Sequence, residues 1–167
     1  MSALKAPTGV LEAIAGRRSV RAYADQAVDR PTVQALLDAA VRAPTAMHEE
    51  PWMFLVIQDR SVLTRLSDRA KPLFAAQVRQ SRTRHSFDAF LDPAFNVFYD
   101  AGTLIVICTD RAGSFVAADC WLAAENLMLA AYGRGLGSCV IGSAVAALNL
   151  PEVKAELGLP EPVTAWS

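Results

Sequence analysis

Two short runs of β-favouring apolar residues constrain the fold of this chain more than any other feature. Residues 53–58 read MFLVIQ and lie between Pro51 and Asp59, and residues 103–109 read TLIVICT. Neither run alternates apolar with polar side chains, and continuous apolar runs are typical of strands that are covered on both faces. The sequence therefore predicts two central strands, each buried on both sides.

The segments around these runs carry the helical spacing of apolar residues. Val10, Leu11 and Ile14 predict a first helix that ends near Gly16. The segment 115–134 is apolar on nearly every side, so this helix should be central or lie at an interface. The other expected helices run from Pro31 to just before Pro44, in patches over residues 63–73, and over residues 151–157. The closing residues PEPVTAWS look like the start of a strand.

The composition points to one folded domain. The chain has 167 residues, of which 53% are hydrophobic and 20% charged, and its formal net charge is −1. It has no internal repeat, low-complexity tract or linker, so we expect a single α+β domain over residues 1–167. The balanced charge argues against nucleic acid as a partner. The apolar excess predicts an obligate dimer whose interface covers the surplus.

The sequence also bears on the cellular compartment. The start has no apolar stretch of signal-peptide length, and the longest apolar segment is interrupted by Asp119, Glu125 and Asn126, which a membrane span would rarely carry. We therefore expect a cytoplasmic protein without membrane contact. The cysteines are odd in number and lack the spacing of zinc ligands, so we expect small core residues in a reducing compartment at Cys108, Cys120 and Cys139.

The stretch RRSVRAY, residues 17–23, concentrates positive charge. If it leaves the first helix extended, Arg17, Ser19 and Arg21 share one face, because side chains alternate along an extended chain. Two guanidinium groups and a hydroxyl on one face suit a phosphate or another oxyanion. Arg18 belongs to the same cluster but falls on the opposite face. The alternative is a solvated basic turn at a helix C-terminus, where cations are favourable.

A second polar loop precedes the first predicted strand. Residues 42–52 read RAPTAMHEEPW, and Thr45, His48, Glu49 and Glu50 lie where sheet folds often bind ligands. The alternative is an ordinary surface turn with solvated side chains. A metal site is not expected here, since adjacent residues cannot easily converge on one ion and no second histidine is near in sequence.

Four segments together resemble the nitroreductase family of FMN-dependent oxidoreductases. They are RRSVRAY (17–23), APTAMHEEPWMFLVI (43–57), YDAGTLIVIC (99–108) and AAENLMLAAYGRGLGSCVIG (123–142), and their order is similar to the family's over nearly all of the chain. The resemblance implies an α+β fold with a central, mostly antiparallel sheet flanked by helices. It also implies an intertwined homodimer that binds FMN at the subunit interface, with contacts from both chains.

The resemblance assigns cofactor-binding roles to the basic segment. Arg17 and Ser19 match positions that contact the FMN phosphate and ribityl chain, and Arg18 is counted with this cluster. Arg21 matches a basic position near flavin N1, where a cation is favourable because two-electron reduction leaves negative charge there. The backbone that approaches the flavin ring is matched by Ile141 and Gly142. The loop that the partner chain lays along the flavin is matched by Pro44, Thr45, Ala46, Met47 and His48.

Two departures from the family pattern affect this site. The family loop usually carries serine, asparagine and glutamine where this chain has Thr45, His48 and Glu50. The histidine adds a group that titrates near neutral pH, and the glutamate adds negative charge near a phosphate-bearing cofactor. Family members also usually continue past Val163 into a strand and a tail that adds a basic residue. Either the sequence is shortened, or the phosphate depends on Arg17 and its neighbours.

The resemblance implies a reaction in which NAD(P)H reduces FMN, and a nitroaromatic, quinone or similar electron-poor acceptor is reduced in turn. Hydride would pass through flavin N5 in a ping-pong sequence, so no side chain is expected to be catalytic. Four phenylalanines would either line the acceptor slot or pack in the core: Phe87, Phe90, Phe95 and Phe98. The alternatives are dehydrogenation, dehalogenation or flavin breakdown on the same scaffold, or a non-catalytic flavin-binding or regulatory dimer.

Overall fold

The centre of the fold is strand β2 (Leu104–Thr109), which has an antiparallel neighbour on each side. The structure is a computed structural model and describes residues 9–80, 90 and 92–166. β1 (Trp52–Ile57) pairs with β2 over its full length, and β3 (Thr164–Ala165) pairs with the end of β2 at Cys108 and Thr109. The sheet is antiparallel, as predicted, and its third strand starts within PEPVTAWS.

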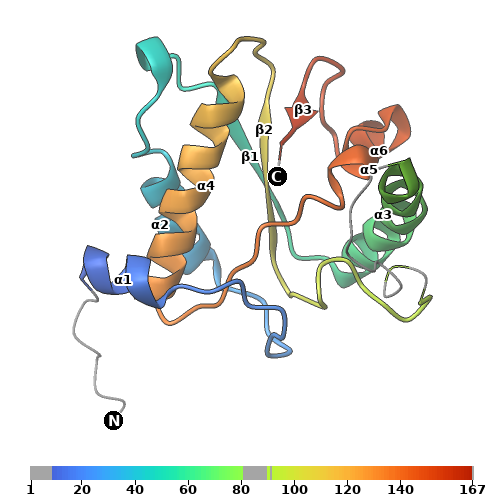
Figure 1. Cartoon of the computed structure of the whole chain (residues 1–167), viewed down its shortest axis with the longest axis horizontal. Coiled ribbons are helices and arrows are strands. Elements are labelled where there is room, and N and C mark those ends of the chain that lie inside the picture. Colours follow the sequence, from blue (N-terminus) through green and yellow to red (C-terminus); the bar gives the residue numbers. More distant parts are fainter. Residues whose placement is uncertain (1–8, 81–89, 91, 167) are drawn as a thin grey trace.

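Different helices cover the two faces of this sheet, so the chain forms three layers (Figure 1). On β2, Ile107 packs with α4, whereas Val106 and Cys108 pack into the cluster on the opposite face, as the period of a strand requires. The helices on the first face are α4 (Val116–Gly133) and α2 (Arg30–Ala40). Those on the second face are α3 (Arg60–Gln80), α5 (Val145–Leu148) and α6 (Pro151–Glu156).

The two predicted strands differ in burial. β2 is buried on both faces, as its apolar run predicted, from Val106 to Thr109. Most of β1 is only half-buried, and Met53 is 39% exposed. The prediction of two-sided burial is therefore wrong for β1. It fails because β1 lies at the edge of the sheet in this chain and has a strand neighbour on one side only.

Most helix ends agree with the sequence signals. α1 (Val10–Gly16) ends at the predicted glycine, and α2 begins after Asp29, whose side chain accepts a hydrogen bond from the Thr32 N–H at 2.8 Å. Just after α4, Gly135 has a φ of 75°, a left-handed conformation that favours glycine beyond a helix end. α3 is longer than predicted, because the helix continues through Pro72 to Gln80. The sequence did not predict α5 or the short 3₁₀ helix η1 (Ala46–His48).

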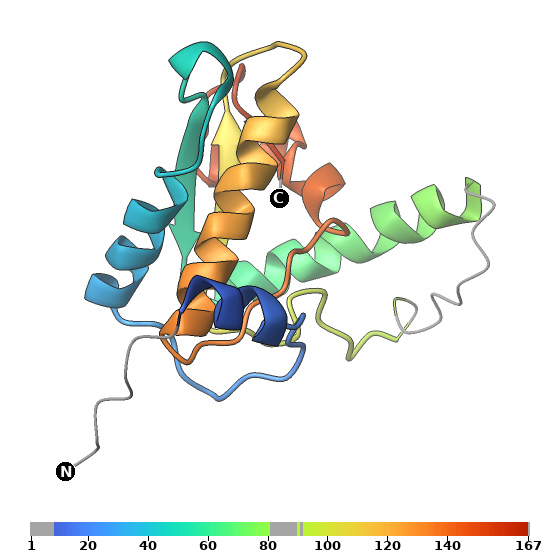
Figure 2. The same ribbon diagram turned by 60° about the vertical axis from the view of Figure 1, so that its left-hand side comes forward.

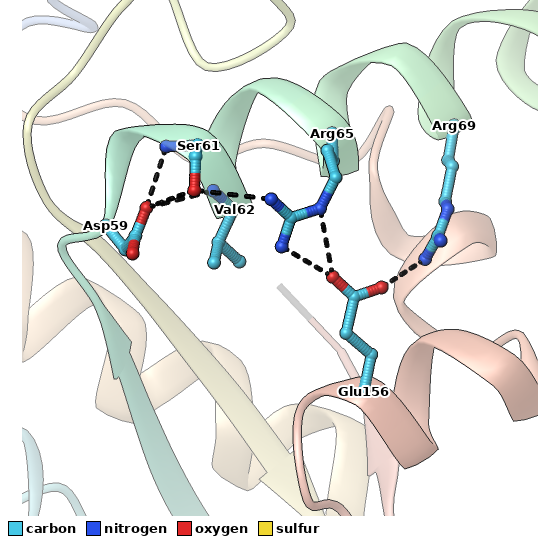
Figure 3. A network of polar contacts seen from close by, with 6 residues as sticks. All are labelled: Asp59, Ser61, Val62, Arg65, Arg69 and Glu156. Atoms are coloured by element: carbon cyan, nitrogen blue, oxygen red, sulfur yellow. Dashed lines mark hydrogen bonds and ion pairs between the residues drawn. The ribbon is translucent and has the colours of Figure 1, made fainter.

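Charged side chains tie α3 to α6 on the face away from α4 (Figure 3). Glu156 on α6 accepts hydrogen bonds from Arg65 and Arg69 on α3, with the Arg65 Nη2 at 2.9 Å. These two arginines, Arg65 first, lower the pKa of the Glu156 carboxyl. At the start of α3, Asp59 accepts from the backbone N–H of Ser61 at 2.8 Å. This network positions the two helices and involves none of the predicted site residues.

Large apolar side chains remain exposed on α1 and α4, two helices that pack against each other. On α1, Leu11 is 78% exposed and Ile14 is 56% exposed. On α4, Trp121 is 49% exposed and Leu122 is 44% exposed. No helix in the described part of the chain is long and apolar enough to cross a membrane. An apolar surface of this kind on a folded domain usually marks a contact with another molecule.

Candidate cofactor site

The basic segment leaves α1 in an extended conformation and lies beside the glycine-rich segment that follows α4. Arg17, at the end of α1, has φ −57° and ψ 137°. Ser19 forms a parallel β-bridge with Ser138, and the Val20 N–H donates to the Ser138 carbonyl at 3.0 Å. The first and last of the four sequence motifs are therefore in direct contact.

Two glycines allow this contact to be close. A Cβ on Gly137 would lie 2.8 Å from the Val20 side chain, and a Cβ on Gly16 would collide with the Tyr132 hydroxyl. Real Cβ atoms do not approach other heavy atoms so closely, so the lack of a side chain at these positions lets α1 and the basic segment lie against the end of α4 (Figure 2).

Arg18 is engaged at the end of α1. Its Nη1 donates to the carbonyl oxygens of Ala15 at 2.8 Å and Arg17 at 2.7 Å. The last carbonyl groups of a helix lack partners within the helix, and a cation is favourable beside them. The alternative interpretation of this cluster, a basic turn at a helix C-terminus, therefore applies to Arg18, whose side chain turns back to the helix.

Three further polar side chains of the segment, those of Arg17, Ser19 and Arg21, are differently placed. Arg17 lies near Glu125 of α4, with its Nε 4.0 Å from the Glu125 Oε1, and its side chain is 27% exposed. Ser19 and Arg21 are exposed, and the Arg21 guanidinium lies 5.8 Å from the centre of the Tyr99 ring. Arg17, Ser19 and Arg21 are accessible, and two of them carry a positive charge that could bind an oxyanion.

A cleft of about 530 Å³ lies behind the basic segment. Val20 and Tyr23 line it from the segment, and Ile141 lines it from the glycine-rich side. The Tyr23 hydroxyl donates to the Val20 carbonyl at 2.6 Å. Burial raises the pKa of Tyr23 to about 12, and the nearby Cys139 thiol acts in the same direction. The side of the segment that faces the cleft thus carries Val20 and Tyr23, whereas Arg17, Ser19 and Arg21 do not line it.

The backbone at Ile141 and Gly142 was predicted to approach a flavin ring. Ile141 is half-buried and packs against the cluster that includes Ile57 and Leu148. Gly142 is exposed, and a Cβ at this position would meet nothing within 4 Å. The chain therefore leaves open space at Gly142, at the end of the same segment that pairs with Ser19.

The predicted loop over residues 44–48 lies elsewhere, at the start of α4. The Ala46 N–H donates to the Oδ1 of Asp119, in the first turn of α4, at 3.2 Å. Within the loop, the Thr45 hydroxyl accepts from the Glu50 N–H at 3.4 Å. Asp119 is 4% exposed, so a buried carboxylate connects the loop to the long helix.

This loop carries backbone strain. Met47, His48 and Glu50 have φ values of 55°, 58° and 44°, in the left-handed region that side-chain-bearing residues rarely adopt. Each such residue costs roughly 1 kcal/mol or more, and strained residues of this kind cluster at binding sites. Met47 is also 88% exposed. Strain and exposure in the same loop support its candidacy as a binding element.

The two groups of predicted site residues lie at opposite ends of α4. Figure 2 shows η1 at one end of this helix and α1 at the other. Asp119, which contacts the loop, and Tyr132, which contacts Gly16, are 13 positions apart on the helix. At 1.5 Å per residue this corresponds to about 20 Å. One chain therefore places the segment of Arg17, Ser19 and Arg21 beside the glycine-rich segment that leads to Ile141 and Gly142, at one end of α4, and Pro44 to His48 at the other.

The basic end of α4 fits a phosphate-bearing flavin. Arg17 and Arg21 are accessible cations, and the Glu125 carboxylate lies at a loose 4.0 Å from Arg17. Gly142 leaves room for a planar group beside the backbone. Within the described residues, no group of three or more histidine, cysteine, aspartate or glutamate side chains could hold a metal ion. The chemistry of this end therefore suits an anionic organic ligand.

The phenylalanines have a packing role where the structure describes them. Phe98 is 3% exposed and belongs to the main core cluster, and Phe90 and Phe95 pack against that cluster. Phe90 and Phe95 contact each other with ring centres 5.0 Å apart. Phe87 lies outside the described residues. These contacts match the core alternative stated for these side chains.

The sequence analysis missed two residues that contact the site. Asp119 drew attention only because it interrupts an apolar helix, yet a carboxylate on an apolar helix face is itself a signal that a partner group lies nearby. Tyr99, at a φ of 55°, lies near Arg21, but the sequence analysis gave it no role beyond its place at the start of the motif 99–108.

Comparisons with known proteins agree with this architecture. The model of the nitroreductase family matches residues 14–166. A relative from Methanothermobacter thermautotrophicus, provisionally named an NADH dehydrogenase/NAD(P)H nitroreductase, is 30% identical over 162 residues, which cover 95% of this chain and 73% of the relative. The nitrobenzene nitroreductase of Ectopseudomonas oleovorans is 28% identical over 183 residues, with 89% of this chain and 79% of that protein covered.

Solved structures give the same result. The crystal structure of a nitroreductase with bound FMN from Bacteroides fragilis superposes with a TM-score of 0.80 at 33% sequence identity, and covers 94% of this chain and 83% of that one. The family match extends over nearly the whole chain and includes all four sequence motifs. This chain belongs to the nitroreductase family.

Proposed function

We propose that this protein is an FMN-dependent oxidoreductase that takes reducing equivalents from NAD(P)H and passes them to electron-poor acceptors such as nitroaromatics or quinones. The observation that carries the proposal is the accessible trio Arg17, Ser19 and Arg21 on an extended segment that pairs, through Ser19, with Ser138 of the glycine-rich segment. The FMN bound to the Bacteroides fragilis relative and the names of the curated relatives support the same cofactor and donor.

The proposal includes a homodimer in which each flavin contacts both chains. In support, the loop over residues 44–48 lies about 20 Å along α4 from the basic segment, by the rise of 1.5 Å per residue. Exposed apolar side chains on the two helices that pack together, among them Leu11, Ile14 and Trp121, offer a surface for a second copy. A second chain could thus bring its own strained loop to the basic end of the first.

In this proposal the side chains of the basic segment and of the loop bind the flavin and do not take part in the chemistry. Arg17 and Ser19 hold the phosphate and ribityl oxygens through charge-assisted and hydroxyl hydrogen bonds. Arg21 holds a positive charge near flavin N1, and the Tyr99 ring beside it restrains its direction. The loop with Met47 and His48 covers the ring and limits access of water. Bound FMN would supply the hydride chemistry at its N5, so no side chain acts as nucleophile or general base.

The test is the absorbance spectrum of the purified protein before and after addition of FMN. We expect a yellow protein that holds one FMN per chain and that is bleached without oxygen by NADH or NADPH. Reoxidation by nitrobenzene or a quinone should restore the yellow colour. A colourless protein that takes up no added FMN would refute the proposal and favour the non-catalytic alternative. A yellow protein that neither donor bleaches would refute the NAD(P)H reaction alone.

A further inference from the structure

We infer that Asp119 is a positioning residue that holds the strained loop over residues 44–50 in the conformation that binds flavin. This inference deepens the proposed function and rests on it for the part that concerns flavin. Asp119 would touch neither cofactor nor substrate. It would act through the backbone of Ala46, to which its Oδ1 is hydrogen-bonded at 3.2 Å.

The burial of Asp119 is the first reason. The side chain is 4% exposed and stands among apolar neighbours, since Val116, Cys120 and Ala123 of the same helix are also buried. A buried carboxylate is costly unless its oxygens are hydrogen-bonded. An apolar residue at this position would therefore make the protein more stable if packing were its only role. The position in the first turn of α4 favours a negative charge, which explains how the carboxylate is tolerated there.

The second reason is the shape of the loop. The loop returns to the sheet within a few residues because Met47, His48 and Glu50 adopt left-handed φ values. Such values are unfavourable for residues with side chains, so the surrounding structure must fix them. Thr45 closes the turn internally by accepting from the Glu50 N–H at 3.4 Å. That bond lies within the loop and cannot fix the loop relative to the rest of the chain.

The contacts that do reach the rest of the chain differ in strength. The ends of the loop are anchored by the buried residues Ala43 and Pro51. Between them, the Arg111–Glu49 ion pair is 3.6 Å long, and both of its side chains are more than half exposed. Such surface pairs contribute little. The bond from the Ala46 N–H ends on a buried carboxylate, so it is less screened by solvent than the surface pair, and it joins the loop to the helix that also contacts Gly16 at its far end.

The test compares Asp119→Ala with Asp119→Asn. The asparagine keeps an oxygen acceptor for the Ala46 N–H, whereas the alanine removes it. Cys120→Ala is the matched control, because it truncates the next buried side chain of α4 without touching the loop. Hydrogen exchange of the 44–50 amides is measured on the full chain without FMN, and FMN affinity is measured separately by quenching of flavin fluorescence.

We expect Asp119→Ala to speed exchange at the Ala46 amide at least about fivefold and to weaken FMN binding by a similar factor, as expected for loss of one buried hydrogen bond. Asp119→Asn should restore both quantities to within about twofold of the unmodified protein, because the acceptor is retained. Cys120→Ala should lower the melting temperature while leaving both unchanged.

Three results would overturn the inference. Unchanged exchange at Ala46 in Asp119→Ala would show that the carboxylate does not hold the loop. Faster exchange with unchanged FMN affinity would show that the order of the loop does not serve flavin binding. Equal effects of Cys120→Ala would reduce the role of Asp119 to general stability. If the unmodified protein takes up no FMN, the proposed function and the flavin part of this inference both fail, and the exchange rates still decide whether Asp119 holds the loop.

Discussion

An exposed segment packs against each end of α4, and different kinds of contact hold the two segments in place. At the C-terminal end, small residues let backbones approach: Gly137 lies against Val20, and Ser19 pairs with Ser138 in an unstrained extended segment. At the N-terminal end, the loop is strained, and a buried carboxylate on α4 holds it. The first arrangement depends on shape and should tolerate changes of pH near neutrality, whereas the second depends on one polar contact.

The difference suits the two roles proposed for these ends. A phosphate needs fixed donors and charge, which an extended segment locked by backbone bonds provides. A loop that covers a ring and must let a donor and then an acceptor enter can keep a less stable conformation. The predictions below test this contrast, beginning with the largest expected effect.

The sharpest contrast at the C-terminal end is between neighbouring arginines. Arg17→Ala should weaken FMN binding about 10- to 100-fold, the loss expected when a hydrogen-bonded charge is removed. Arg18→Ala should leave FMN affinity within about threefold, because Arg18 donates to the carbonyls of Ala15 and Arg17 and faces the helix. Fluorescence titration with FMN measures both. Equal losses for the two variants would contradict the assignment.

Two glycines of the same segment should respond in opposite ways. Gly137→Ala places a Cβ 2.8 Å from Val20 and should lower the free energy of unfolding by about 1–3 kcal/mol, the cost of overpacking. Gly142→Ala meets nothing within 4 Å and should change it by less than about 0.5 kcal/mol. If the flavin lies against Gly142, that variant should still lose FMN affinity. Urea unfolding and FMN titration separate the two effects, and a stable Gly137→Ala variant would refute the close approach.

The shape-based end should show one pH effect, from Tyr23. Burial raises the pKa of the Tyr23 phenol to about 12 in the folded chain, above the ordinary value of about 10. The unfolded chain therefore loses this proton first as the pH rises. The associated stability is fully present below about pH 10 and is lost between about pH 10 and 12. Tyr23→Phe should remove this part of the fall when urea unfolding is compared at pH 9 and pH 11, and an unchanged slope would contradict it.

The smallest effect is expected at the N-terminal end, from the ion pair on the loop. The Glu49 and Arg111 side chains are 52% and 58% exposed and 3.6 Å apart. Glu49→Gln should therefore change the free energy of unfolding by less than about 1 kcal/mol. Loop exchange rates should also stay the same, since Asp119 holds the loop. A large change in the free energy of unfolding or in the loop exchange rates would show that the surface pair, and not Asp119, anchors the loop.

The sequence predicted where the helices and strands lie better than how deeply they are buried. The runs at 53–58 and 103–109 became strands, and the apolar helix over 115–134 became α4, because local spacing decides such elements. Burial of β1 was not predictable, because it depends on which strand stands at the sheet edge. The left-handed turn at Met47 and His48 was also not predicted: histidine adopts that conformation more often than most residues, but methionine rarely does.

The candidate site, too, was predicted where local pattern decides and missed where long-range packing decides. Alternation along the extended segment 17–23 separated the accessible Arg17, Ser19 and Arg21 from the inward Val20. The contact between Ser19 and Ser138 and the role of Asp119 depend on long-range packing, which no local pattern encodes. The sequence also could not predict that the basic segment and the loop over residues 44–48 lie at opposite ends of α4, because this depends on which segments pack against each end of the helix.

The central claim is that each flavin site joins the basic end of one chain to the loop of another. It can be tested with two variants that each lose one half, Arg17→Ala and the double variant Met47→Glu with His48→Glu. Neither variant alone should hold FMN at a concentration that just saturates the unmodified protein, because each should lose at least about tenfold in affinity. Heterodimers of the two, co-expressed with different tags and purified through both, contain one intact site if the halves come from different chains. We predict one FMN per heterodimer, and a heterodimer that binds none would contradict the account.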